Sequence, residues 1–112
     1  MASNQETADY ILGQIEGAGA VSIRKMFGEF GVYCDAKFVG AICDNTLYLK
    51  LTEPGRASAP DLDEGSPYPG AKPHLVIDAD LLEATPRLHE LIRITWSALP
   101  APKPKKKKST KG

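Results

Sequence analysis

The stretch from Arg24 to Leu51 constrains the fold most, because it holds two turn signals between runs of apolar residues. At the second turn, Asp44 and Asn45 separate two such runs; both residue types tolerate positive φ, so they predict a two-residue hairpin. Side chains alternate between the faces of a sheet, so this hairpin places Ile42 and Leu47 together on one face. The other face then carries Val39, Ala41, Tyr48 and Lys50.

The first turn, from Asp35 to Lys37, is compatible with a loop of two or of three residues. A two-residue loop would put the Glu29 carboxylate on the apolar face, whereas a three-residue loop puts Phe30 and its alternate neighbours there. A slip of one residue turns every side chain to the opposite face, so burial favours the three-residue loop. We therefore predict three antiparallel strands whose core face consists of Phe30, Val32, Cys34, Phe38, Ile42, Leu47, Leu49 and Leu51.

Two helices are predicted, one before this meander in the sequence and one after it. The first follows a capping box from Ser3 to Glu6, and its apolar residues recur at helical spacing up to Ile15. The second runs from residue 85 to residue 99, with Thr85 as N-cap and Pro86 in the first turn. Each helix has one apolar stripe, so we expect both to pack on the core face of the sheet.

Further strands are weaker predictions. Val21-Ser22-Ile23 leads into the first long strand, which Gly28 and Gly31 interrupt, and His74 to Asp78 is short and β-branched. The proline-rich segment 53–73 predicts a long loop, with Ser66-Pro67-Tyr68 as an edge strand. The fold class is therefore α+β: two layers, with an antiparallel sheet of four or five strands and the N- and C-terminal helices packed on one face. We expect one domain over residues 1–100 and a disordered tail rich in lysine and proline over residues 101–112.

A family resemblance lies within the same stretch. The string from Arg24 to Gly28, the segment FGVY ending at Tyr33, the Asp-Ala-Lys turn and the Leu-Tyr-Leu-Lys strand resemble the N-terminal domain of the TfoX/Sxy competence regulators. The matching motif residues are Arg24, Met26, Phe27, Gly28, Gly31, Tyr33, Leu47, Tyr48, Leu49 and Lys50. This chain departs at Glu29, Phe30 and Ala36, where the family has Gly, Tyr and Gly. The resemblance covers roughly residues 5–99 and implies the same kind of sheet and a regulatory role in competence gene expression. Full-length members carry a second, C-terminal domain, which we do not expect here.

Composition and charge narrow the classes of function. With 42% hydrophobic and 25% charged residues, the chain is typical of a soluble globular domain. It shows no membrane-length apolar run and no secretory signal, so we expect a cytoplasmic protein without membrane contact. Residues 1–99 contain 8 basic and 14 acidic groups, a net charge of −6. Six lysines balance this charge: Lys103, Lys105, Lys106, Lys107, Lys108 and Lys111.

No motif predicts catalysis, a cofactor or a metal. His74 and His89 have no Cys or carboxylate set at ligand spacing, and the acidic residues near Asp61 do not complete a calcium loop. No serine lies in a nucleophile elbow. Cys34 and Cys43 point to opposite faces in the predicted register, so we expect two free thiols, both small apolar strand residues, rather than a disulfide. The sequence therefore predicts a protein that is not an enzyme.

Three binding features remain. The outer face of the meander combines Tyr33, Val39, Ala41 and Tyr48, which predicts an interface for a protein partner or a second copy, unless the last helix or the long loop covers it. This regulatory or protein-interaction module is the leading hypothesis. The alternative is weak, non-sequence-specific nucleic-acid binding through the six tail lysines, because clustered lysines neutralise phosphates. A third reading is a small-molecule sensor near Met26 to Gly28.

Overall fold

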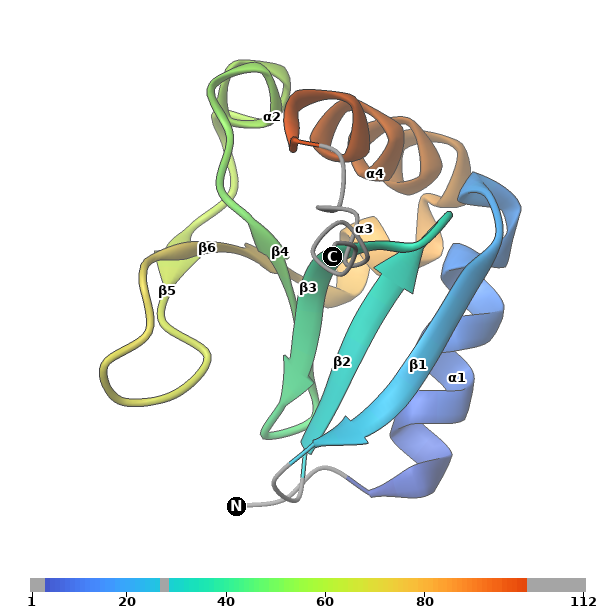
Figure 1. Ribbon diagram of the computed structural model, residues 1–112. Coiled ribbons are helices and arrows are strands. Elements are labelled where there is room, and N and C mark those ends of the chain that lie inside the picture. The colour runs from blue at the N-terminus through green and yellow to red at the C-terminus, as the bar shows by residue number, and fades with distance from the viewer. Residues whose placement is uncertain (1–3, 27–28, 101–112) are drawn as a thin grey trace, which may run out of the picture.

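The chain folds into one six-stranded antiparallel sheet with helices packed against one of its faces (Figure 1). The computed structural model describes residues 4–26 and 29–100. The strand order is β1-β2-β3-β4-β6-β5, so consecutive strands are neighbours except where β6 pairs with β4. The α+β class and the antiparallel sheet are confirmed, with six strands instead of four or five.

The strands and helices have the following bounds. The strands are β1 (Val21–Met26), β2 (Glu29–Cys34), β3 (Lys37–Cys43), β4 (Thr46–Lys50), β5 (Glu64–Gly65) and β6 (His74–Ile77). The helices are α1 (Gln5–Ile15), the single 3-10 turn η1 (Glu16–Ala18), α2 (Glu53–Ser58), α3 (Ala79–Glu83) and α4 (Thr85–Ala98). None of the helices in the described ranges is long and apolar enough to cross a bilayer.

The two long helices form where the apolar spacing predicts them, but both begin differently. Asn4 caps α1, because its side-chain oxygen accepts the Thr7 N–H at 2.8 Å, whereas Ser3 lies outside the described residues. Thr85 is the first residue of α4 and provides no side-chain cap, so its predicted role as N-cap is wrong. Pro86 has no backbone N–H that would need an acceptor in the first turn, which suits a helix start without such a cap.

Polar contacts fasten α4 to the rest of the molecule. The Nζ of Lys37 donates to the carbonyls of Trp96 and Leu99, each at 2.8 Å, and lies 3.9 Å from the centroid of the Trp96 ring. These carbonyls lie at the C-terminal end of the helix, where carbonyls lack the usual intrahelical donors and a cation also suits the helix dipole. Arg93 reaches back to the Gly17 and Ala18 carbonyls after α1, at 3.2 Å each.

The first predicted strand is two strands. Met26 of β1 lies opposite Glu29 of β2, so the chain reverses direction between these residues and forms an antiparallel hairpin. The glycines were read as interruptions within one strand. An interior glycine marks a bulge, a bend or a reversal equally well, which is why the sequence did not separate these cases.

A two-residue turn and a β-bulge together set the register of β2 and β3. Asp35 and Ala36 have φ of 46° and 73°, so the turn contains two residues and the predicted three-residue loop is wrong. Cys34 pairs with Lys37 and Tyr33 with Phe38, but Val32 pairs with Gly40. Val39 is therefore the extra residue of a bulge, and the bulge restores the alternation that the burial argument required.

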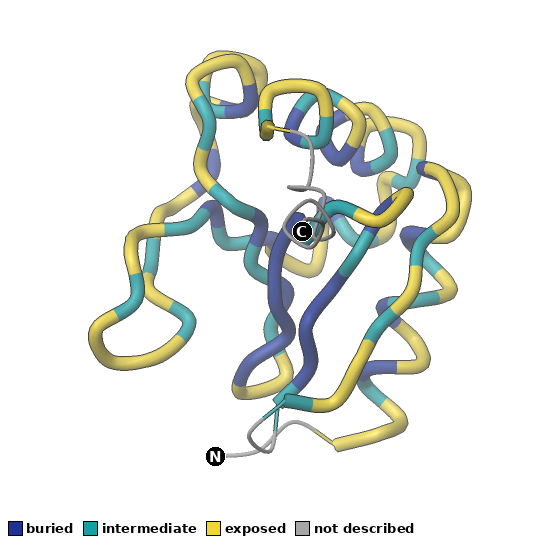
Figure 2. The backbone as a smooth tube through the Cα atoms, in the orientation of Figure 1, coloured by how far each residue is buried: buried dark blue, intermediate teal, exposed yellow. Residues whose placement is uncertain are grey.

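Most of the predicted core face is correct. Phe30, Val32, Cys34, Ile42, Leu47 and Leu49 are all buried in the main core, which also takes the apolar stripes of α1 and α4. Figure 2 shows the burial concentrated on the central strands. Phe38 is half-buried and pairs with Tyr33 of the other face, and Leu51 is exposed, so both were assigned wrongly. Val39 is also corrected, since it is 0% exposed and belongs to the core.

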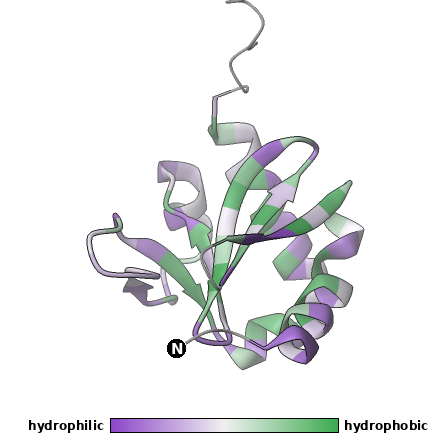
Figure 3. Cartoon of the chain, turned by 60° about the horizontal axis from the view of Figure 1, so that its bottom comes forward, coloured by the Kyte–Doolittle hydropathy of each residue, from purple (hydrophilic) through white to green (hydrophobic). Residues whose placement is uncertain are grey.

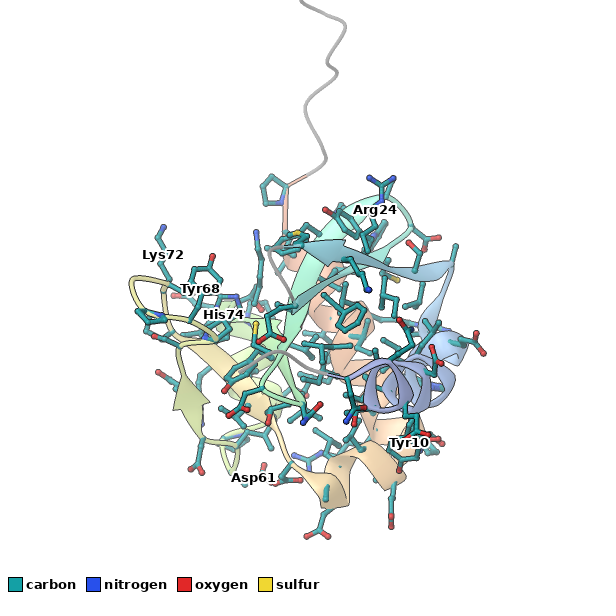
Figure 4. All side chains as sticks on the ribbon, turned by 90° about the horizontal axis from the view of Figure 1, so that it is seen from below. Tyr10, Arg24, Asp61, Tyr68, Lys72 and His74 are labelled. Atoms are coloured by element: carbon teal, nitrogen blue, oxygen red, sulfur yellow. The ribbon has the colours of Figure 1, made fainter. Side chains whose placement is uncertain are left out.

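The segment after β4 contains more regular secondary structure than the predicted long loop. It contains α2 and the short strand β5, and this edge strand lies at Glu64–Gly65 rather than at Ser66 to Tyr68. Arg56 organises the connection by donating to the Pro60 and Leu62 carbonyls, each at 2.8 Å, and by pairing with Glu64 at 3.1 Å. The segment after β5 extends beside the sheet as an arm that carries Tyr68 (Figures 1 and 4).

Candidate interaction surface

One face of the sheet has no helix over it among the described residues, and we call it the open face (Figure 1). Strand alternation and pairing assign its side chains, since Arg24 lies across from Gly31, Gly31 from Ala41, and Ala41 from Tyr48. Along β4 hydrophobic and hydrophilic residues alternate, whereas β3 is hydrophobic over most of its length; Figure 3 colours the strands by hydropathy. The open face consists of Ser22, Arg24, Met26, Glu29, Gly31, Tyr33, Phe38, Ala41, Cys43, Thr46, Tyr48, Lys50, His74 and Val76.

Aromatic rings and cations form a continuous row across this face. The rings of Tyr33 and Phe38 meet edge to face, with centroids 5.2 Å apart and an interplanar angle of 60°. The Arg24 guanidinium lies 5.6 Å from the Tyr33 centroid, and the Lys50 ammonium lies 5.1 Å from the Phe38 centroid. A cation over an aromatic ring is held in place by the ring quadrupole, so both positive charges are positioned on the open face.

A cavity of about 400 Å³ lies next to this row. Ala41 and Cys43 are among its lining residues, together with Met26, Phe38 and Tyr68. Gly31 helps to shape the region, because a Cβ at this position would lie 3.0 Å from both Met26 Sδ and Phe38 Cε1. The cavity is mostly apolar, and its lining also includes Glu29, whose carboxylate accepts the Asp44 N–H at 3.3 Å.

The structure brings together three of the four predicted interface residues. Tyr33 and Tyr48 are half-buried on the open face, and Ala41 lies between their strands at 8% exposure. Val39 does not belong there, because the bulge turns it into the core. Of the two predicted covers, no helix in the described ranges lies over the face, and the long segment reaches the cavity through Tyr68.

Sequence reasoning missed Phe38, Met26 and Tyr68 as members of this surface. Phe38 was assigned to the core because the bulge after it leaves no mark in the apolar pattern. Met26 was treated only as part of a possible ligand site, and Tyr68 lies on an arm whose path the sequence does not define. The six lysines from Lys103 to Lys111 lie outside the described residues, as do Phe27 and Gly28.

Both cysteines are buried and free, as predicted. Cys34 lies on the helix-covered face and Cys43 on the open face, so the two thiols cannot pair. Burial raises the pKa of both thiols, and the nearby Asp35 and Glu29 carboxylates add to the effect at Cys34 and Cys43 respectively. Raised pKa values keep these thiols protonated and poorly nucleophilic at neutral pH.

Other reactive side chains are engaged in structural contacts. His89 Nε2 lies 2.7 Å from the Gln14 carbonyl, and His74 Nδ1 lies 2.8 Å from the Lys72 carbonyl. Asp61 pairs with Arg87 at 2.7 Å, and this hydrogen bond lowers the pKa of the carboxyl group. Within residues 4–26 and 29–100, no group of three or more His, Cys, Asp or Glu side chains could hold a metal ion.

Fold and surface together define a small α+β domain with one helix-covered sheet face and one apolar, aromatic face that is open. The chain matches the TfoX N-terminal domain family over residues 13–99 and belongs to that family. It is also 43% identical over 109 residues to a protein of Spirochaeta aurantia described as an uncharacterized 12.7 kDa protein in the trpE 5' region. That alignment spans 97% of this chain and 94% of its relative.

Membership in the family agrees with the resemblance in the first strands, and the structure shows what the motif residues do. Leu47 and Leu49 are fully buried in the core, whereas Tyr48 and Lys50 lie between and beyond them on the open face. Arg24, Met26, Gly31 and Tyr33 also belong to the open face. The motif therefore contributes to both faces of the sheet.

Proposed function

We propose that this chain is a regulatory module that binds a protein partner, or a second copy of itself, through the open face. The observation that carries this proposal is the one-sided placement of the helices, which leaves half-buried Tyr33, Phe38 and Tyr48 beside an apolar cavity. Apolar surface rimmed by polar groups is typical of interaction sites. Aromatic residues and arginine are also enriched in protein interfaces.

The family supports the regulatory part of the proposal. The TfoX/Sxy resemblance implies a role in competence gene expression, and we extend to this chain only the regulatory character, in the cytoplasm. The proposal includes no catalytic step. The two thiols are held protonated, and both histidines contact main-chain carbonyls.

Replacing Tyr48 by Glu tests the interface. The wild-type mass is measured in solution by light scattering, and a tagged protein is used to recover partners from native extract. We expect a dimer or a recovered partner that Tyr48→Glu loses, because a carboxylate on the apolar face must be desolvated in the complex. If the wild type is monomeric and recovers nothing that the variant loses, the open face is not an interface.

Tyr10→Glu is the matched control. Tyr10 is 49% exposed on α1, on the opposite side of the molecule from Arg24 and Tyr68 (Figure 4). The same change in chemistry at this position is expected to leave the mass and the recovered partner unchanged. Loss of binding in both variants would point to a general effect of the new charge and would contradict the proposal.

A second candidate is nucleic-acid binding through the tail. Six of the fourteen basic residues lie between Lys103 and Lys111, whereas residues 1–99 carry a net charge of −6. Deleting residues 101–112 is then expected to abolish binding to duplex DNA and to flatten its salt dependence. Titration of both proteins at two salt concentrations measures this, and equal affinity of the two proteins would reject the tail as the contact.

A further inference from the structure

The cavity in the open face is suited to one large apolar group. Its volume is about 400 Å³, and Met26, Phe38 and Ala41 line it. Its lining also includes an acidic residue, Glu29. Burying a large apolar side chain there removes its surface from water, which favours binding and can anchor a segment of a partner. The open face therefore provides a specific position for one apolar anchor.

Positively charged side chains border this anchor position and start from strands on either side of it. Arg24 lies on β1 and Lys50 on β4, while the cavity lies mainly over β2 and β3 between them. The Tyr33 and Phe38 rings hold these cations. Figure 4 also shows Lys72 and His74 toward the same side as Arg24, away from Asp61. The rim of the open face is thus basic, although residues 1–99 are acidic as a whole.

The sheet geometry sets the spacing of a matching ligand. Three strand intervals separate β1 from β4, so the strands that carry Arg24 and Lys50 lie about 14 Å apart across the sheet. An extended peptide rises about 3.3 Å per residue, and its residues i, i+2 and i+4 point in the same direction. Carboxylates at i and i+4 then meet Arg24 and Lys50 while the side chain at i+2 enters the cavity.

Single-stranded nucleic acid fits the same surface less well. Bases bind such surfaces by stacking on aromatic rings. Here Tyr33 and Phe38 each already hold a cation and contact each other edge to face. The net charge of −6 over residues 1–99 also repels a polyanion more than it repels a peptide with two carboxylates.

We propose that the open face binds an extended acidic segment of a partner protein, with Asp or Glu at i and i+4 and a large apolar residue at i+2. This inference rests on the proposed function, since it names the chemistry of the partner at the same face. The aromatic–cation row positions the charges, and the cavity selects the apolar residue.

The motif is tested with a display library of random peptides, with the full-length protein as the target. The peptides have about eight residues, long enough to cross four strands when extended. Panning against the wild type is expected to enrich an aromatic residue, Leu or Met flanked at two residues on each side by Asp or Glu. Enrichment of basic or uncharged sequences, or of none, would overturn the inference.

The affinity of an enriched peptide is then measured by fluorescence anisotropy against matched variants. We expect Arg24→Glu and Lys50→Glu each to weaken binding about tenfold, because attraction becomes repulsion at a rim position. Lys25→Glu is the control, since Lys25 is exposed on the same strand but faces away from the open face. A similar loss in Lys25→Glu would mean that only net charge matters and would overturn the inference.

A second pair of variants tests the cavity. Ala41→Leu fills the cavity and is expected to lower the affinity for the same peptide at least about tenfold, because the apolar anchor can no longer enter. Ala98→Leu adds the same side chain at an exposed position of α4 and is expected to leave affinity unchanged. Circular dichroism and thermal unfolding verify that both variants fold, and unchanged affinity of a folded Ala41→Leu would overturn the inference.

Other outcomes separate this inference from the proposed function. A wild-type dimer that Tyr48→Glu splits, together with no enriched peptide, supports the proposed function and rejects the acidic segment. Another outcome concerns an oligothymidylate of about 15 nucleotides. If Arg24→Glu and Lys50→Glu abolish its binding, but deletion of residues 101–112 does not, the open face is a nucleic-acid site, and both the proposed function and the acidic-segment inference are rejected.

Discussion

The two faces of the sheet differ in what covers them, although they share the same strands. The helix-covered face buries Phe30, Val32, Leu47 and Leu49 against α1 and α4, while the open face leaves Tyr33, Phe38 and Tyr48 partly exposed. On β4 the two kinds of residue alternate at every position. Neighbouring residues can therefore have unrelated roles, one in stability and the next in binding.

The largest expected difference between the faces is at Leu49 and Lys50. Leu49→Ala removes a fully buried side chain and should lower the free energy of unfolding by about 3 kcal/mol, whereas Lys50→Ala should cost less than about 1 kcal/mol. Urea unfolding followed by circular dichroism measures both values. Equal losses in the two variants would contradict the division into a stabilising and a binding face.

Val39 and Phe38 test the bulge. Val39 is fully buried, so Val39→Ala should lower the free energy of unfolding by about 2 kcal/mol. Phe38→Ala should cost less, about 1 kcal/mol, because this ring is partly exposed on the open face. The same unfolding experiment ranks the two variants, and the opposite order would mean that Val39 faces outward in a regular strand.

The turn before the bulge should respond to glycine. Ala36 has φ of 73°, in the left-handed region that a Cβ disfavours. Ala36→Gly is therefore expected to raise the free energy of unfolding by about 0.5–1 kcal/mol, after the entropic cost of glycine. Thermal and urea unfolding measure the gain. A loss of stability would contradict the two-residue turn and with it the register that assigns the faces.

The smallest effect is a difference in thiol reactivity. Burial raises the pKa of both cysteines, so alkylation should be slow at neutral pH and should accelerate only as the pH rises above the usual range of about 8.5. Cys43 lines the cavity of the open face, whereas Cys34 lies under the helices. Iodoacetamide labelling read by mass spectrometry should therefore modify Cys43 about tenfold faster, because Cys34 requires local opening. Faster labelling of Cys34 would mean that the helices do not protect their face.

Much of the fold was predictable because burial enforces alternation. Glu29 in the core would be costly, and this argument alone placed Phe30, Val32 and Cys34 correctly. The argument could not tell how the chain achieves that placement. A three-residue loop and a two-residue turn followed by a bulge bury the same residues of β2, and they differ only at Phe38 and Val39.

The candidate site was less predictable than the fold. Alternation identified Tyr33, Ala41 and Tyr48, but the error at the bulge exchanged Phe38 for Val39. Tyr68 reaches the cavity on an arm between β5 and β6, and its position depends on tertiary structure rather than on local pattern. The positions of Arg24 and Lys50 over aromatic rings likewise follow from pairing across four strands, which a pattern along one segment does not reveal.

The order of the strands also has a consequence for the kinetics of folding. β1 to β4 pair in sequence through short connections, so their contacts close small loops at low entropic cost. β6 must return to β4 across the segment that contains α2 and β5. We therefore expect the transition state for folding to contain the β1–β4 meander, with φ-values near zero in β6. On this pathway the open face exists before the last strand closes the sheet.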